Sequence, residues 1–205
     1  MFRNRVHAGR LLAGELADLA GSPEAVVLGI PRGGVIVAAE IADKLGLPLD
    51  VVVTSKIGAP GNAEYAIGAI DADGAITQNV YAGYSMAELE HLGRPVRERI
   101  ARRMELYRAG RGAELDAVGK TAVLVDDGIA TGLTAFAAVD YLKRCGASRI
   151  VLAVPVIAAD AARVMRTRVD RVVALEEPEI FYAVGQFYRR FEQTSDDEVL
   201  HALSR

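Results

Sequence analysis

The segment Ala122-Val123-Leu124-Val125-Asp126-Asp127-Gly128-Ile129-Ala130-Thr131-Gly132-Leu133-Thr134-Ala135 carries more structural information than any other part of this chain. Its first four residues are apolar, which predicts a short buried strand. Two carboxylates follow, at Asp126 and Asp127, and a turn rich in Gly and Thr then leads into the apolar pattern of a helix. Unpaired amide groups and the positive end of the helix dipole attract anions at a helix N-terminus. The segment therefore predicts a phosphate-binding turn.

The polar groups of this turn indicate what accompanies the phosphate. Thr131 and Thr134 add hydroxyl donors, while Gly128 and Gly132 let the backbone approach an anion without a Cβ atom in the way. Two acids fit here when the ligand has hydroxyl groups or a metal beside its phosphate, as a ribose 5-phosphate does. The alternative is an ordinary turn whose acids cap the helix. A cap uses one acid, and this turn has two acids and two threonines, so we favour the ligand site.

The order of elements predicts one α/β domain over residues 1–205. A helix is expected at 6–19, and strands then alternate with helices, which implies right-handed crossovers and a doubly wound, mainly parallel five-stranded sheet with flanking helices. Ligands of such sheets bind beyond the carboxyl ends of the strands. The expected strands are 25–30, 49–54, 121–125, 149–154 and 171–175, and the expected helices between them are 35–45, 133–144 and 160–168.

Composition limits the class of protein. The 205 residues suffice for a full α/β core, and 51% hydrophobic with 25% charged residues is typical of a globular protein. A net charge of -3 gives no reason to expect nucleic acid or an acidic membrane surface. The single cysteine, Cys145, excludes an internal disulfide and suits a reducing compartment. Because no leader or membrane-length apolar run is present, we expect a cytoplasmic protein.

A second turn, Pro31-Arg32-Gly33-Gly34, follows the first expected strand and opens a helix. Its two glycines free the backbone for φ values that other residues avoid, and Arg32 offers a planar set of donors suited to phosphate oxygens. The sequence alone is common turn material. Its position, at the same edge of the sheet as the phosphate-binding turn, favours a second anion site.

The segment quoted first resembles the motif that binds 5-phosphoribosyl 1-pyrophosphate (PRPP) in the type I phosphoribosyltransferases: an apolar strand, two acidic residues, small residues and Thr-Gly-x-Thr. The resemblance implies that Asp126 and Asp127 are catalytic, contact the ribose 2′- and 3′-hydroxyls, and hold Mg²⁺ through water. It also implies that the turn wraps the 5′-phosphate. The residues implied in binding PRPP are Gly128, Ile129, Ala130, Thr131, Gly132, Leu133 and Thr134.

The resemblance also implies a pyrophosphate subsite. In this family the turn after the first core strand binds pyrophosphate, and residues 29–34 resemble the version that contains Arg-Gly-Gly. The family often has a basic residue after the next strand, where Lys56 stands, although an ordinary exposed lysine at a strand end is the alternative. The implied pyrophosphate-binding residues are Arg32, Gly33, Gly34 and Lys56, of which Arg32 and Lys56 are also catalytic candidates.

Residues 58–119 have no evident place in the parallel core, and we expect a flexible lid with a helical insert there. Lys56-x-Gly58-x-Pro60-Gly61 followed by Glu64-Tyr65 loosely resembles the lid of adenine phosphoribosyltransferase. Residues 94–111 contain seven arginines with interspersed acids. This stretch is either an RNA-binding face or a solvated helix with ion pairs along it, and the acids favour the second interpretation.

The sequence departs from one subgroup of the family at Ala130. The 6-oxopurine phosphoribosyltransferases have an aspartate there, near the purine N7, so the acceptor implied here is not a 6-oxopurine. The departure also leaves no acid in the motif to serve the incoming base, which makes Glu64 a catalytic candidate. Residues 176–205 are expected to form a hood and a C-terminal tail, with Phe181 stacked on the base.

Taken together, the resemblance implies a phosphoribosyltransferase, which is a pentosyl-transferring glycosyltransferase of nucleotide metabolism with Mg²⁺ as its cofactor. PRPP and a small-molecule nitrogenous base would be the substrates. We expect a homodimer that engages neither nucleic acid nor membrane. Two alternatives stay open: a regulator that senses PRPP or a nucleotide without turnover, and a PRPP hydrolase that uses water as the acceptor.

Overall fold

The core is a parallel sheet of five strands in the order β2-β1-β6-β7-β8, shown by a computed structural model that describes residues 1–109 and 117–205. Most residues of the three central strands are buried because helices cover both faces of the sheet. The strands are β1 (Ala25–Gly29), β2 (Leu49–Val51), β6 (Thr121–Val125), β7 (Arg149–Val156) and β8 (Arg171–Glu176).

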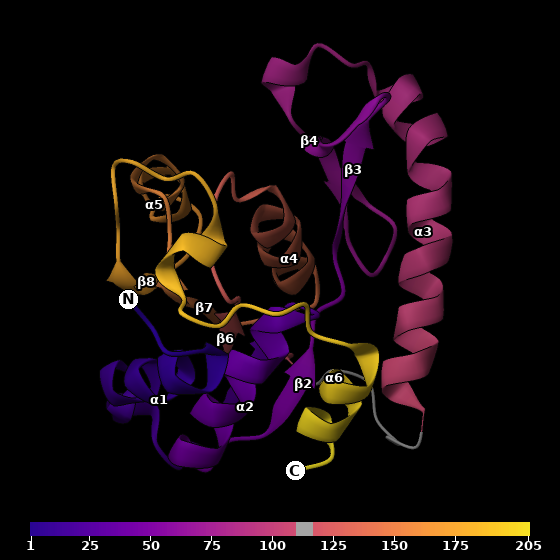
Figure 1. Ribbon diagram of the computed structural model, residues 1–205. Helices are drawn as coiled ribbons and strands as arrows, with labels where there is room; N and C mark the ends of the chain where they lie inside the picture. Colours follow the sequence, from indigo (N-terminus) through magenta and orange to yellow (C-terminus); the bar gives the residue numbers. More distant parts are fainter. Residues whose placement is uncertain (110–116) are drawn as a thin grey trace.

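Two helices pack on each face of this sheet (Figure 1). Helices α1 (Arg5–Glu15) and α2 (Gly33–Leu45) pack on one face, while α4 (Leu133–Arg144) and α5 (Ala159–Met165) pack on the other. The doubly wound fold expected from the sequence is confirmed. The chain passes from β1 through α2 to β2 on one side, whereas β6 lies on the other side of β1 and continues through α4 to β7, so the topological switch point lies between β1 and β6.

The predicted bounds of the core elements are mostly close to those observed. The strand at 121–125 and the helix at 133–144 agree with β6 and α4. The predicted second strand, 49–54, is too long, because β2 is an edge strand from which the chain leaves after Val51 to enter another sheet. The predicted helix 6–19 is also too long, since α1 ends at Glu15 and a short 3₁₀ helix, Ala17–Leu19, follows it.

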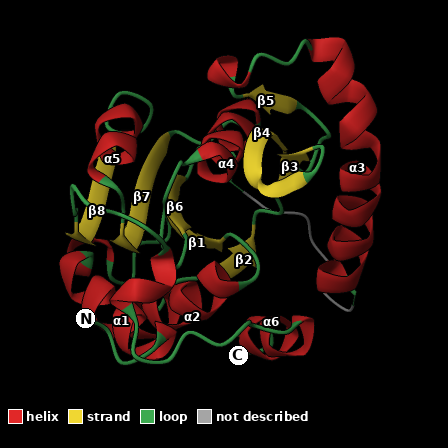
Figure 2. Cartoon of the chain, turned by 45° about the horizontal axis from the view of Figure 1, so that its top comes forward, coloured by secondary structure: helices red, strands yellow, loops and turns green. Residues whose placement is uncertain are grey.

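The segment between β2 and β6 builds a separate antiparallel sheet that the sequence did not predict. Its order is β3-β4-β5, and Figure 2 shows it with α3 at one side of the parallel sheet. The predicted lid falls mostly on this small sheet and α3, while residues 110–116 of the insert lie outside the described residues. The elements are β3 (Ser55–Ala59), β4 (Asn62–Ile70), β5 (Ile76–Gln78), the 3₁₀ helix Val80–Ala82 and α3 (Met86–Arg108).

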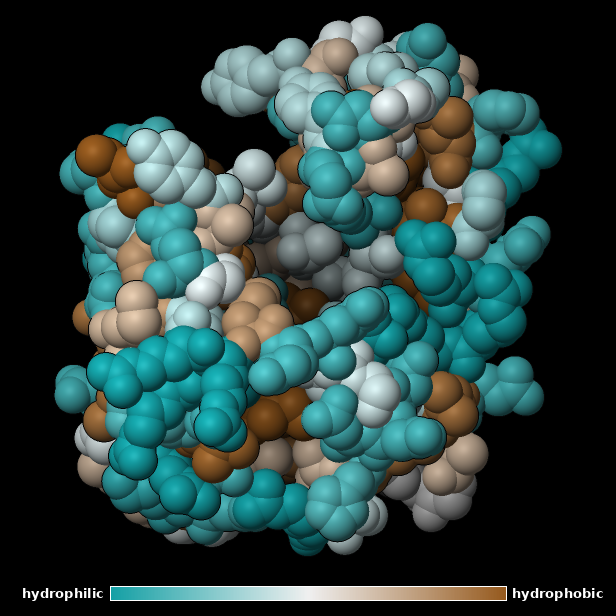
Figure 3. Space-filling model, viewed as in Figure 1, coloured by the Kyte–Doolittle hydropathy of each residue, from teal (hydrophilic) through white to brown (hydrophobic). Residues whose placement is uncertain are grey.

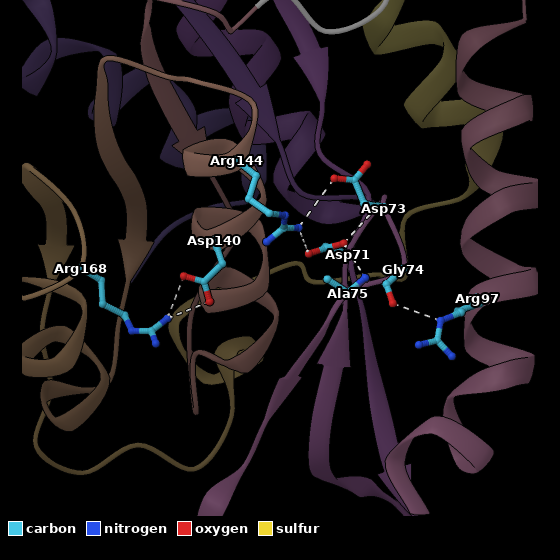
Figure 4. Close-up of polar contacts among 8 residues, drawn as sticks. All are labelled: Asp71, Asp73, Gly74, Ala75, Arg97, Asp140, Arg144 and Arg168. Carbon is cyan, nitrogen blue, oxygen red and sulfur yellow. Dashed lines mark hydrogen bonds and ion pairs between the residues drawn. The ribbon is translucent and has the colours of Figure 1, made fainter. Parts of the chain in front are cut away.

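Ion pairs and hydrogen bonds join the small sheet to its neighbours (Figure 4). Asp71 is 1% exposed; its carboxylate accepts hydrogen bonds from the amides of Asp73 and Ala75 and pairs with Arg144 of α4. From the other side, Arg97 of α3 donates to the carbonyl oxygen of Gly74 at 3.1 Å. The turn between β4 and β5 is therefore tied both to the parallel-sheet domain and to α3.

The N-terminal and C-terminal segments of the chain meet at one edge of the domain. After β8 the chain passes through the 3₁₀ helix Val184–Phe187 to α6 (Asp196–Leu203), which packs against α2 and α3. The Phe2 amide donates to the carbonyl oxygen of Phe187, which joins the two terminal segments. No helix among the described residues is long and apolar enough to cross a membrane.

The crossing of α1 and α2 depends on a glycine. A Cβ atom at Gly9 would lie 2.7 Å from the Val37 carbonyl oxygen, whereas one at Gly14, on the same helix, would meet nothing within 4 Å. We expect Gly9→Ala to destabilise the fold by about 1–3 kcal/mol through overpacking. Gly14→Ala should instead stabilise it by roughly 0.5–1 kcal/mol. Urea denaturation measures both, and equal effects at the two positions would contradict this account of the crossing.

Candidate functional site

Two turns meet at the switch point, the Pro31–Gly34 turn between β1 and α2 and the turn at 126–132 between β6 and α4. The Ile30 amide donates to the Val125 carbonyl oxygen at 2.8 Å, which fixes one turn against the other. A Cβ atom at Gly34 would lie 2.7 Å from that carbonyl oxygen, and one at Gly33 would lie 1.9 Å from Asp127 Oδ2. The peptide bond between Pro31 and Arg32 is cis.

This close packing is the reason for the two glycines. We expected Gly33 and Gly34 to supply unusual φ values, but neither is among the described glycines with positive φ. That explanation was wrong. The glycines are required because no side chain fits between the turns, and the sequence alone does not show which turns meet.

The two acids of the motif differ in environment. Asp126 is half-buried, and its Oδ1 accepts the Asp127 amide at 2.8 Å. Burial first, and then the charge of Asp127, raise the pKa of Asp126 well above the usual range of a carboxyl group. Asp127 forms an ion pair with Arg5, with 2.6 Å between Arg5 Nε and Asp127 Oδ2. The site therefore places the carboxyl of Asp126, which resists ionisation, beside that of Asp127, which is paired with Arg5.

The turn at 126–132 keeps most of its amide groups available. Within the described part of the chain, the amides of residues 130–134 donate to no protein acceptor, as expected at the start of α4. Ile129 is different: it is 2% exposed, its amide donates to the Val156 carbonyl oxygen, and its own carbonyl accepts the Ala158 amide. Ile129 thus anchors the turn to β7, and the neighbouring residues present their amides.

Two glycines shape this turn. Gly132 has a φ of +82° as the N-cap residue of α4, a conformation that favours glycine. A Cβ atom at Gly128 would lie 2.4 Å from Val184 Cγ1, so the C-terminal segment packs directly on the turn. Of the other residues implied in binding PRPP, Ala130 and Thr131 are exposed, Thr134 is half-buried and Leu133 is buried.

Arg32 precedes the first residue of α2 and lies near the C-terminal helix. Its Nη1 is 3.9 Å from Asp196 Oδ2, and the Asp196 carboxylate also accepts the hydroxyl of Tyr107. No pattern in the sequence indicated that Asp196, at the start of α6, would lie near the Pro31–Gly34 turn. Arg32 therefore lies at the predicted edge of the sheet, with the carboxylate of Asp196 near it.

Lys56 and Glu64 lie on the small sheet and form an ion pair with each other. The expectation that Lys56 closes a strand of the parallel sheet was wrong, because Lys56 lies within β3 and Glu64 lies within β4. Lys56 Nζ is 2.7 Å from Glu64 Oε2, and the Glu64 side chain is 91% exposed. The hydrogen bond and charge of Lys56 lower the pKa of Glu64, which makes that carboxylate a weaker base in this arrangement.

Phe181 belongs to an aromatic cluster in the predicted hood. Its ring centroid is 5.3 Å from that of Phe187, and the cluster also contains Phe2, Tyr188 and Phe191. Phe181 remains half-buried, so one part of the ring packs inside the protein. Figure 3 shows a hollow between the small sheet and the parallel-sheet domain.

The described residues contain no group of three or more His, Cys, Asp or Glu side chains that could hold a metal ion. Asp126 and Asp127 are two carboxylates at the end of one strand, and hard cations such as Mg²⁺ prefer such oxygen ligands. An ion at this place would be held by these carboxylates through water and would take further oxygens from a bound phosphate compound.

Comparison with known proteins agrees with this geometry. A family model described as the phosphoribosyl transferase domain matches residues 3–192. Relatives from two strains of Mycobacterium tuberculosis, CDC 1551 and H37Rv, have names that describe phosphoribosyl transferases and are 46% identical over 209 residues. The alignment covers 100% of this chain and 47% of each relative. The chain therefore spans about half the length of these curated relatives.

A solved structure matches over nearly its whole length. The crystal structure of TT1426 from Thermus thermophilus has a TM-score of 0.83 and 43% sequence identity to this chain. The match covers 99% of this chain and 97% of the Thermus chain.

The raised pKa of Asp126 predicts how stability depends on pH. In the unfolded chain this carboxyl ionises near its ordinary value of about 3.9, whereas the folded protein keeps the proton to higher pH. Stability should fall as pH rises through this interval, because the unfolded state then binds fewer protons than the folded state. We expect Asp126→Asn to raise the Tm at pH 7, and the gain to shrink toward pH 4.

Thermal denaturation of both proteins in magnesium-free buffer between pH 4 and 8 measures this gain. Glu24→Gln, which removes an exposed carboxylate outside the site, is the matched control. A lower Tm for Asp126→Asn at pH 7 would show that the folded protein needs the ionised acid.

Proposed function

Because the chain belongs to the family of phosphoribosyl transferase domains, we propose that it transfers the 5-phosphoribosyl group of PRPP to a nitrogenous base and releases pyrophosphate. The observation that carries this proposal is the meeting of two helix N-termini at one switch point. One turn has two carboxylates and a series of available amides, and the other has Arg32 and two glycines. Two separate phosphate subsites with acids between them suit a ligand that has a phosphate at each end of a ribose.

The proposed binding assigns each part of PRPP to one part of the site. The amides of residues 130–134 and the hydroxyls of Thr131 and Thr134 bind the 5′-phosphate. Asp126 and Asp127 accept hydrogen bonds from the ribose hydroxyls and hold Mg²⁺ through water. When bound, Mg²⁺ supplies positive charge beside the pyrophosphate oxygens.

The proposed reaction breaks the bond between ribose C1 and the pyrophosphate oxygen, whose electron pair leaves with the pyrophosphate. Positive charge then grows on the ribose and negative charge on the leaving group, which Arg32 and Lys56 stabilise. In the structure Arg32 lies near Asp196 and Lys56 is paired with Glu64. Pyrophosphate would replace these carboxylates, and the released Glu64 could accept the proton of the base that attacks C1.

The acceptor we propose is a base other than a 6-oxopurine. Ala130 supplies no carboxylate for the purine N7, and Phe181 offers an apolar ring face that suits any aromatic base. We also propose that the protein works in the cytoplasm, which its single cysteine suits. The homodimer stays a prediction, and light scattering in solution would test it.

The deciding experiment measures pyrophosphate release from PRPP with magnesium across a panel of bases. Turnover that requires one base supports the transferase. Tight PRPP binding without turnover would support the sensing regulator, and release at the same rate without any base would support the hydrolase.

Arg32 gives a prediction for the leaving group. Arg32→Ala should lower the transfer rate by about 10²–10³, the usual effect of removing one preorganised donor. Affinity for ribose 5-phosphate, which lacks pyrophosphate, should change little. Steady-state kinetics and calorimetry measure the two effects, with Arg163→Ala as a control because Arg163 is exposed on α5 and pairs with surface acids. An unchanged rate would remove Arg32 from the mechanism.

The acceptor pocket gives another prediction. Wild-type protein should turn over hypoxanthine and guanine only weakly, and Ala130→Asp should improve these two bases relative to others. Phe181→Ala should raise the KM for the accepted base, because stacking of a base on an aromatic ring contributes roughly 1–3 kcal/mol. Rapid use of hypoxanthine by the wild type, or an unchanged KM in Phe181→Ala, would contradict this view of the pocket.

A further inference from the structure

We propose that Arg5, near the N-terminus, is a positioning residue that fixes the Asp127 carboxylate for binding the ribose of PRPP. The inference rests on the proposed function and adds a residue from a part of the chain that lies outside both turns. It predicts that Arg5 acts on ligands through Asp127 and not by direct contact with phosphate.

The contacts of Arg5 converge on Asp127. Arg5 Nε lies 2.6 Å from Asp127 Oδ2, and Arg5 Nη1 donates to the Glu192 carbonyl oxygen at 2.8 Å. The Arg5 guanidinium also lies 3.9 Å from the centroid of the Phe191 ring. The side chains of Arg5 and Asp127 are 12% and 16% exposed, so the pair is shielded from water far more than a surface ion pair is. Three partners hold the guanidinium in one orientation.

The backbone of Asp127 is fixed by the same cluster. The Tyr188 hydroxyl donates to the Asp127 carbonyl oxygen at 2.6 Å, and the Tyr188 ring stacks on Phe191 with 4.9 Å between centroids. Tyr188 also contacts the ring of Phe2, which belongs to the same N-terminal segment as Arg5. The two ends of the chain therefore hold Asp127 by both its side chain and its backbone.

The pair lies at the centre of the proposed site. A Cβ atom at Gly33 would be 1.9 Å from Asp127 Oδ2 and 2.6 Å from Arg5 Nε. The Pro31–Gly34 turn therefore packs directly against the ion pair of Arg5 with Asp127. Without Arg5, Oδ2 of Asp127 would lose the hydrogen bond and the cation that fix it, and the carboxylate would be free to rotate. With Arg5 in place, the Asp127 carboxylate is a fixed acceptor for the ribose hydroxyls. Preorganisation of this kind raises affinity by lowering the cost of ordering on binding.

The same helix supplies a matched control. Arg10 of α1 also forms an ion pair, with Glu40 at 2.7 Å, but its side chain is 67% exposed and its partner belongs to α2. Arg10→Met and Arg5→Met remove the same kind of side chain from one helix. Only Arg5→Met should affect a ligand that contains ribose.

The test compares the binding of PRPP and of inorganic pyrophosphate by calorimetry in the presence of magnesium. Arg5→Met should raise the Kd of PRPP about tenfold or more, as expected when a charged group loses its hydrogen-bond partner. Pyrophosphate should bind within about twofold of wild type, and Arg10→Met should change neither Kd. Equal weakening of both ligands by Arg5→Met would show a general structural role and overturn the inference.

A double-mutant cycle shows whether Arg5 acts through Asp127. When Asp127→Asn is already present, adding Arg5→Met should change the Kd of PRPP by less than about twofold. A further loss as large as that in the wild-type background would overturn the inference. If Arg5→Met does not fold, Phe191→Leu removes the ring beneath the guanidinium and should weaken PRPP binding alone, whereas unchanged binding would overturn the inference.

The wild-type titration separates this inference from the proposed function. Absence of PRPP binding to the wild type would overturn both. Tight binding to the wild type that persists in Arg5→Met would overturn the positioning role and leave the proposed function standing.

Discussion

The close approach of two turns at the switch point is the constraint on which the rest of the site depends. Parallel pairing of β1 with β6 places Gly29 beside Val125, so both strands end at the same level. The helices that follow then begin side by side, and only glycines fit where the turns touch. Two helix N-termini share one space as a result. Because the positive ends of helices favour anions, this arrangement supports the proposal of two separate phosphate subsites with the acids between them.

The same arrangement concentrates acids in a half-buried place. Burial and the neighbouring charge raise the pKa of Asp126, which opposes folding at neutral pH. A sequence selected only for stability would have no reason to keep two adjacent carboxylates there, since buried charges are ordinarily paired. Local conflicts of this kind are expected at functional sites, whereas the apolar strands and amphipathic helices of the parallel-sheet domain are consistent with its fold.

Local sequence patterns predicted the features that depend on neighbouring residues, such as the bounds of individual strands and helices. The apolar run of β6 and the periodicity of α4 gave accurate bounds, and the parallel order followed from alternation of strands and helices. The small sheet was missed because β4 is rich in Ala and Gly and shows no clear alternation of polar and apolar residues. The partners of Asp127 were missed for another reason: Arg5 precedes it by 122 residues, and no local pattern relates residues that meet only through the tertiary fold.

Lys56, Arg32 and Asp127 each form an ion pair within the protein. The exposure of the paired side chains divides these ion pairs into two kinds. The pairs Lys56–Glu64 and Arg32–Asp196 include side chains open to solvent, and exposed ion pairs contribute little to stability. A phosphate could therefore replace their carboxylates at small cost. The pair of Arg5 with Asp127 is shielded, and separating it would leave charged groups without partners. Ligand binding should therefore break the two exposed pairs and retain the shielded one. Lys56 and Arg32 then become available to the ligand, while Asp127 keeps its orientation.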